Sequence, residues 1–139
     1  MSTKRMAKFT NVKHEPAKTY GFKRSKVFDI PLYRSRFRLV ITNNVGEYMK
    51  CIHRNDGFGH AEGCCVCYGR TSEVVLGVET GSTLSHEAVV HEICHLGQCI
   101  LQHVGVEPDW KNQEPLAYLT GYVGGIILRT LNRWHVPLK

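Results

Sequence analysis

Long apolar runs are missing from this chain of 139 residues. No stretch of about 18 consecutive apolar residues occurs, so the sequence predicts no transmembrane helix. The first 20 residues are basic and polar, and they contain no apolar segment of the kind that a secretory signal requires. Internal repeats and low-complexity segments are also missing. We therefore expect one cytoplasmic domain rather than a membrane or secreted protein.

The cysteines can be interpreted as disulfides, as free thiols or as metal ligands. The chain has six cysteines, and a disulfide framework is one reading of that number. A chain without a secretory signal is expected in a reducing compartment, where cysteines are buried thiols or metal ligands. Cys94 and Cys99 also fall inside a predicted helix, which is an unusual place for disulfides. The sequence therefore favours free thiols.

Positive charge is concentrated at the N-terminus. The net charge is +6, but residues 1–26 hold eight Lys or Arg against Glu15 alone, and the remaining ten basic and eleven acidic residues give −1. We interpret residues 1–26 as a basic, flexible arm and residues 27–139 as one domain. Such an arm can bind nucleic acid or an acidic partner, or it can be a solvated tail, which its composition favours.

The chain after the arm carries five strand patterns. In residues 36–42 apolar side chains first alternate with arginine and then run together, as in a half-buried strand that enters a core. Asn43-Asn44 then marks a turn, so the next pattern is expected to be a strand that can pair in a hairpin. The other four predicted strands cover residues 27–31, 45–52, 64–68 and 73–78.

Two helices are predicted after the strands, over residues 84–103 and 113–132. Gly105 fits the left-handed position that closes the first helix. Three glycines interrupt the second helix and should permit close approach to the first: Gly121, Gly124 and Gly125. The order of elements predicts an α+β domain with a mostly antiparallel sheet followed by two packed helices.

The first predicted helix contains the pentad His91-Glu92-Ile93-Cys94-His95, an HExxH pattern. Two histidines four residues apart lie about 40° apart around a helix, so both imidazoles can reach one cation. The surrounding residues are largely apolar, and partly buried histidines need partners that a cation supplies at once. The pattern therefore predicts that His91 and His95 bind Zn²⁺.

A third ligand is expected in the second helix. Glu114 follows His95 by nineteen residues, which allows the first helix to end, turn and return. Its alternative role is that of a first-turn glutamate stabilised by the helix dipole. His103 lies about 12 Å along the axis from His95, too far to share the metal, and His86 points elsewhere. We therefore predict Glu114 as the ligand.

Other polar residues around the pentad have catalytic interpretations. Glu92 lies at the edge of the metal face, where it can take a proton from a metal-bound water without being a ligand. Tyr118 follows Glu114 by one turn and could donate to a ligand or to a developing oxyanion, although a packed tyrosine is as good an interpretation. Glu87, one turn before His91, could orient that imidazole.

A second cluster could hold a structural zinc. Cys64 and Cys67 form a CxxC, and Cys51 and His53 share one face of the strand predicted there. His60 and Cys65 lie in the same region. Because this CxxC falls within a strand pattern rather than a turn, small buried thiols are the better interpretation.

Residues 84–131 resemble small zincin-like metallopeptidases encoded in bacteriophage genomes. The resemblance lies in the HExxH pentad with Ser85 to Ala88 before it, in Gly105, and in the run from Asn112 to Tyr122. Residues 30–33 and 37–42 also look like the opening strands of that family. The resemblance implies a gluzincin-type site with His91, His95 and Glu114 as ligands and Glu92 as base. It also implies the cytoplasm of an infected host cell.

Two classes of function compete. The first is a zinc-dependent peptidase acting on a peptide or protein substrate. The second is a catalytically inactive, zinc-stabilised binding protein whose arm docks on nucleic acid or on a host protein. A protease associated with DNA would combine the two, and a water-accessible coordination position distinguishes catalysis from binding.

Overall fold

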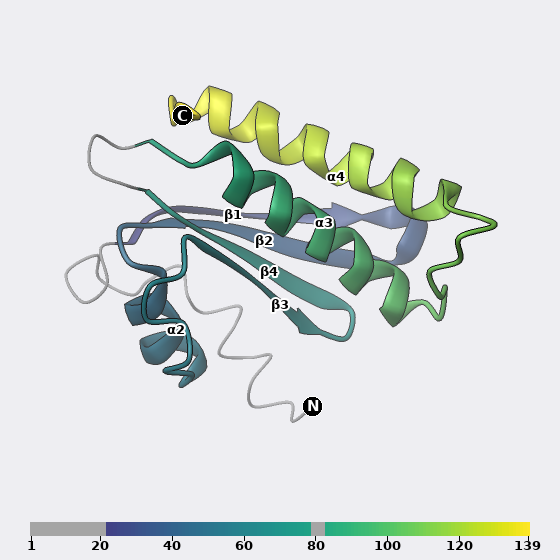
Figure 1. The fold of residues 1–139 in the computed structure, drawn as a ribbon, viewed down its shortest axis with the longest axis horizontal. Coiled ribbons are helices and arrows are strands. Elements are labelled where there is room, and N and C mark those ends of the chain that lie inside the picture. Colours follow the sequence, from purple (N-terminus) through teal and green to yellow (C-terminus); the bar gives the residue numbers. More distant parts are fainter. Residues whose placement is uncertain (1–21, 79–82) are drawn as a thin grey trace.

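The computed structural model describes residues 22–78 and 83–139, and Figure 1 shows a sheet with helices on both faces. In chain order the elements are strand β1 (Phe22–Ile30), the 3-10 turn η2 (Pro31–Tyr33), β2 (Ser35–Thr42), helix α2 (Val45–His53), β3 (Gly63–Tyr68), β4 (Thr71–Gly77), α3 (His86–His103) and α4 (Glu114–Arg133). This confirms the α+β class. No helix in these two ranges is long and apolar enough to cross a membrane.

The described sheet has four strands in the order β1-β2-β4-β3. β1 pairs antiparallel with β2, and β3 pairs antiparallel with β4. The two central strands, β2 and β4, pair parallel with each other. Nearly every residue of β2 and β4 is buried, which explains why both strands carry continuous apolar runs. The prediction of a mostly antiparallel sheet is right for the outer pairs. The parallel centre exists because α2 and β3 form the crossover between β2 and β4.

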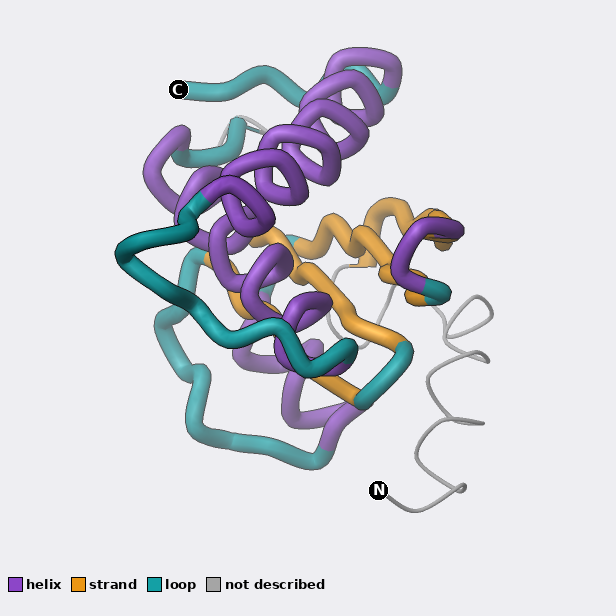
Figure 2. The backbone as a smooth tube through the Cα atoms, turned by 90° about the vertical axis from the view of Figure 1, so that its right-hand side faces the viewer, coloured by secondary structure: helices purple, strands orange, loops and turns teal. Residues whose placement is uncertain are grey.

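Helices cover the two faces of the sheet unequally. α3 and α4 lie over one face, where Leu39, Val74 and Leu76 from the central strands pack against apolar residues of both helices. The alternate residues Val40 and Val75 face the other way and pack against α2. Figure 2 shows the sheet between these two helical layers. The larger core therefore lies under α3 and places that helix firmly on the sheet.

Helix α2 corrects the strand predicted over residues 45–52. Asn44 caps the helix, since its side-chain Oδ1 accepts a hydrogen bond from the backbone N–H of Glu47 at 3.0 Å. Val45, Tyr48 and Met49 are buried at helical spacing. The short apolar run was compatible with both structures, and tertiary contact with the sheet decided between them.

Strand β1 corrects the boundary of the basic arm. β1 begins at Phe22, and residues 24–26 pair with residues 39–41 of β2. Residues 22–26, which we assigned to the arm, therefore belong to the sheet. The rest of the predicted arm, residues 1–21, lies outside the described residues.

The ends of α3 follow from local chemistry. Ser85 caps the N-terminus, with its Oγ accepting from the N–H of Ala88 at 3.2 Å. At the other end Gly105 has φ +79° and Val106 donates its N–H to the carbonyl of Leu101 at 2.9 Å, which is a Schellman closure. The predicted glycine stop is confirmed.

Close approach of α3 and α4 depends on one glycine from each helix. A Cβ on Gly97 would lie 2.7 Å from Oγ1 of Thr120, and a Cβ on Gly124 would lie 3.2 Å from the side chain of Ile93. A Cβ on Gly121 would meet nothing within 4 Å. The expectation that α4 glycines permit close packing is therefore confirmed at Gly124 but not at Gly121, and Gly97 was missed.

We predict opposite effects on stability at these two kinds of glycine. Gly97→Val should lower the free energy of unfolding by about 1–3 kcal/mol, because its side chain must push α4 away. Gly121→Ala should raise it by about 0.5–1 kcal/mol, because it removes backbone freedom without a clash. Urea unfolding followed by circular dichroism measures both. A Gly97→Val protein as stable as the wild type would contradict the helix contact.

Candidate metal centre

Helix α3 brings His91 and His95 together. Their Nε2 atoms lie 3.0 Å apart, and their rings meet edge to face with centroids 4.7 Å apart. Two nitrogens bound to one tetrahedral zinc at ordinary Zn–N distances are about 3.3 Å apart. Both nitrogens are therefore close to the spacing that a shared cation requires.

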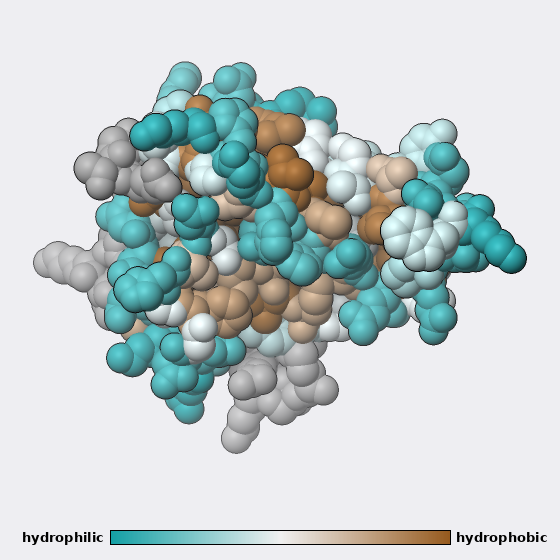
Figure 3. Space-filling model, in the orientation of Figure 1, coloured by the Kyte–Doolittle hydropathy of each residue, from teal (hydrophilic) through white to brown (hydrophobic). Residues whose placement is uncertain are grey.

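Both imidazoles are exposed, which corrects the expectation that they are partly buried. The apolar residues of the pentad region point the other way, because Ile93 and Leu96 lie in the core beneath α3. The pair is thus reached from solvent. In Figure 3 hydrophilic side chains follow the line of α3, and a more hydrophobic band lies on the β3 side of it.

Glu92 faces inward from the same helix. Glu92 is 6% exposed, and its Oε2 has no hydrogen-bond partner among the described residues. Burial raises the pKa of this carboxyl above its usual value, while His91 and His95 act in the opposite direction. A carboxyl with a raised pKa beside two histidines is typical of a general base.

The space for Glu92 comes from a glycine on the neighbouring strand. A Cβ on Gly63, the first residue of β3, would lie 2.8 Å from Cγ of Glu92. The carboxylate therefore lies against the start of the edge strand, between α3 and the sheet. Nothing in the local sequence distinguished Gly63, since its role depends on a contact with a residue 29 positions away.

We predict that Glu92→Gln stabilises the metal-free protein at neutral pH. A raised folded-state pKa means that the wild type has its full stability below the usual pKa of 4.5 and loses part of it as pH rises through the folded-state pKa. Glutamine removes the buried charge and should flatten this dependence. Urea midpoints from pH 4 to pH 7, measured in chelator, test the prediction.

The matched control is Glu47→Gln, an exposed glutamate on α2. It should not reproduce the stabilisation expected of Glu92→Gln, because its side chain is already in water. A Glu92→Gln protein that loses stability relative to the wild type as pH rises from 4 to 7 would show that Glu92 is stabilised as an anion, contrary to its burial.

Glu114 is not brought to the histidine pair. It is the first residue of α4, it is exposed, and its side chain has no hydrogen bond or ion pair with the described residues. Thr120 is the α4 residue that meets Gly97 of α3, and Gly97 follows His95 by two residues. Glu114 lies six residues before Thr120, which is about 9 Å along α4 from this contact between the helices. Among residues 22–78 and 83–139 no three His, Cys, Asp or Glu side chains converge as a metal site.

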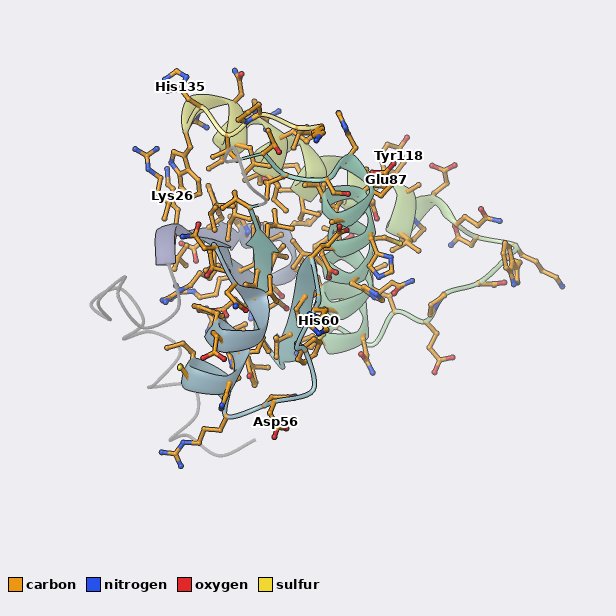
Figure 4. All side chains as sticks on the ribbon, turned by 60° about the vertical axis from the view of Figure 1, so that its left-hand side comes forward. Lys26, Asp56, His60, Glu87, Tyr118 and His135 are labelled. Atoms are coloured by element: carbon orange, nitrogen blue, oxygen red, sulfur yellow. A yellow bond between two sulfur atoms is a disulfide. The ribbon has the colours of Figure 1, made fainter. Side chains whose placement is uncertain are left out.

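Tyr118 and Glu87 lie on the solvent side of the helices (Figure 4). Tyr118 is 77% exposed and makes no hydrogen bond with the pair among the described residues, so its role as an oxyanion donor stays a prediction. Glu87 accepts a hydrogen bond from the hydroxyl of Ser85 at 3.1 Å, and backbone and Ser85 hydrogen bonds lower its pKa. Glu87 is therefore engaged at the helix N-terminus instead of orienting His91.

A cavity of about 610 Å³ adjoins α3 on the side of the loop that leads to α4. Cys94 and Gln98 line it from α3, and Leu116 and Thr120 line it from α4. Neither His91 nor His95 lines this mostly apolar cavity, but Cys94, which lies between them in sequence, does. It is large enough to receive a substrate side chain.

The alternative of a structural zinc at the second cluster is not supported by the positions of its residues. Residues 64 and 67 of β3 face opposite sides of the sheet, with Cys64 buried against α2 and Cys67 joined to Cys99 of α3 in a disulfide. His53 instead binds Oε1 of Glu73 through Nε2 at 2.8 Å and also contacts the Tyr68 hydroxyl. The expectation of a buried thiol is right for Cys64, and the expectation that disulfides are absent is wrong.

Comparisons with known proteins do not bear on the function of this site. No family model, no curated protein and no solved structure matches the chain. The resemblance to phage zincin-like proteins therefore stays a prediction. What supports a function is the arrangement of His91, Glu92 and His95.

Proposed function

We propose that this protein is a zinc-dependent peptidase of the zincin type. The observation that carries the proposal is the pair of imidazole nitrogens 3.0 Å apart beside a buried carboxylate, one oxygen of which has no hydrogen-bond partner in residues 22–78 and 83–139. An exposed histidine pair alone would suit any metal-binding helix. Glu92 adds a base that burial has already made more basic than an ordinary glutamate.

Each residue has a distinct task in this proposal. His91 and His95 hold the metal through Nε2, and zinc, when bound, supplies acidity to a water ligand and polarises a substrate carbonyl. Glu92 takes the proton of the attacking water and passes it to the leaving amine. Tyr118 is the candidate donor to the oxyanion, and the cavity beside Cys94 receives a substrate side chain.

Glu114 remains the proposed third ligand. Its carboxylate is exposed and unpaired among the described residues, so no existing interaction has to break for it to approach a metal. The approach requires movement of the first turn of α4 and of the loop before it, residues 104–113. Metal binding would then order this end of α4 against α3.

We predict one zinc per chain, lost in His91→Ala and in His95→Ala because each removes one of two adjacent donors. Glu114→Ala should weaken zinc binding, whereas His103→Ala should not, although both residues are exposed. Elemental analysis and competition with a chelator measure the effects. Full zinc retention in both histidine variants would rule out the site. Equal affinity in Glu114→Ala and the wild type would reject only the third ligand.

We also predict that Glu92→Gln keeps the zinc and lowers peptide hydrolysis by about 100-fold or more, because base and proton donor are lost together. Cleavage of a peptide library and zinc content are measured on the same samples. Glu47→Gln is the matched control and should cleave like the wild type. Equal cleavage by Glu92→Gln would point to another base or to a contaminating protease.

The same assay distinguishes the competing function. A zinc-loaded wild type that cleaves nothing across a broad library would favour the inactive, zinc-stabilised binding protein. The nucleic-acid or acidic partner proposed for its basic arm concerns residues 1–21 above all, which lie outside the described part. Nucleic-acid binding that falls steeply with salt and vanishes when the arm is deleted would then identify the arm as the binding element.

A further inference from the structure

Three cysteines from two elements meet between β3 and α3. Cys67 of β3 forms a disulfide with Cys99 of α3. The free thiol of Cys65 also lies there, with its Sγ 3.8 Å from the Sγ of Cys99. Because side chains alternate along a strand, Cys65 and Cys67 share the face of β3 that is turned toward α3. One helix cysteine therefore has two strand cysteines within reach.

The position of the Cys99 sulfur is the important feature. Residues two apart on a strand are separated by about 7 Å, and this sulfur is bonded to one of the two strand cysteines and in contact with the other. It is therefore within contact distance of both strand cysteines. A free thiol in contact with one sulfur of a disulfide is the arrangement from which thiol–disulfide exchange proceeds.

We propose that Cys65, Cys67 and Cys99 form a thiol–disulfide exchange site in which Cys99 alternates between the two strand cysteines. The Cys65 thiol first loses its proton to solvent. The thiolate then attacks Sγ of Cys99, the Cys65–Cys99 bond forms as the Cys67–Cys99 bond breaks, and Cys67 leaves as a thiolate. One disulfide is present before and after, so the step consumes no oxidant.

The exchange produces a free thiol at the protein surface, on Cys67. Cys67 is exposed, whereas Cys65 is only partly accessible and Cys99 is 8% exposed. The exchange therefore moves the disulfide inward and releases the thiol that solvent can reach. That thiolate can attack a low-molecular-weight disulfide, forming a mixed disulfide at Cys67 and releasing one small thiolate. The site does not depend on the proposed zinc chemistry.

The environment of Cys65 sets the rate of exchange. Burial raises the pKa of its thiol, and Glu92 of α3, Cys64 of β3 and Glu73 of β4 raise it further. Only the thiolate attacks, so the exchange should be slow at neutral pH and accelerate by about tenfold per pH unit above it. The interior thiol thus limits how often Cys67 is released.

The test traps the released thiol in the full-length protein. Cys51→Ser and Cys94→Ser remove the two exposed free thiols. The oxidised protein is incubated with iodoacetamide at pH 7, 8 and 9 without reductant, digested with pepsin in acid and mapped by mass spectrometry. We expect alkylated Cys67 together with a Cys65–Cys99 cross-link, accumulating faster at higher pH.

Matched variants isolate the attacking cysteine. Cys65→Ser and Cys65→Ala should abolish alkylation at Cys67, whereas Cys64→Ser, on the opposite face of β3, should not. Cys67→Ser should form the Cys65–Cys99 disulfide on oxidation, which is an independent check. Alkylation at Cys67 in the Cys65 variants would overturn the proposal. So would a Cys67–Cys99 disulfide that persists to pH 9, or three reduced thiols holding a metal.

Discussion

The contact between α3 and the edge strand β3 determines the surroundings of Glu92, of the histidine pair and of the cysteine cluster. It has two points of attachment along the helix, the Glu92 side chain against Gly63 and the bond between Cys99 and Cys67. The first removes the carboxylate from water, and the second joins strand and helix covalently. His91 and His95 lie next to this contact, so their position and the acidity of Glu92 depend on the same packing.

Burial of a carboxylate without a full set of partners is a cost that stability alone would remove. Oε2 of Glu92 has no hydrogen-bond partner among the described residues, although Leu96 and Ile93 beside it are packed in the main core. A group of this kind destabilises the metal-free fold and becomes useful when a water or a cation is nearby. We interpret the cost as evidence for function, and the glutamine variant measures both together.

The opposite face of the sheet shows a different solution to the same problem. Glu73 is fully buried, but its Oε1 binds Nε2 of His53, and His53 also contacts the Tyr68 hydroxyl. Here the carboxylate has a partner from α2, so the network holds that helix on the sheet. The two buried glutamates therefore differ in one respect: Oε1 of Glu73 has a histidine partner, whereas Oε2 is unpartnered in both residues among the described part of the chain.

Local sequence was enough for the elements with strong local signals. The strand over residues 36–42, the helix closed by Gly105 and the approach of His91 to His95 were all predictable, because alternation, capping and four-residue spacing act between near neighbours. Contact with the sheet, together with the Asn44 cap, decided that residues 45–53 form a helix, since their short apolar run suits either state until it meets the sheet. Tertiary structure alone decided where Glu114 lies and which cysteines meet, because Cys67 and Cys99 are 32 residues apart and no spacing rule relates a strand to the helix that packs across it.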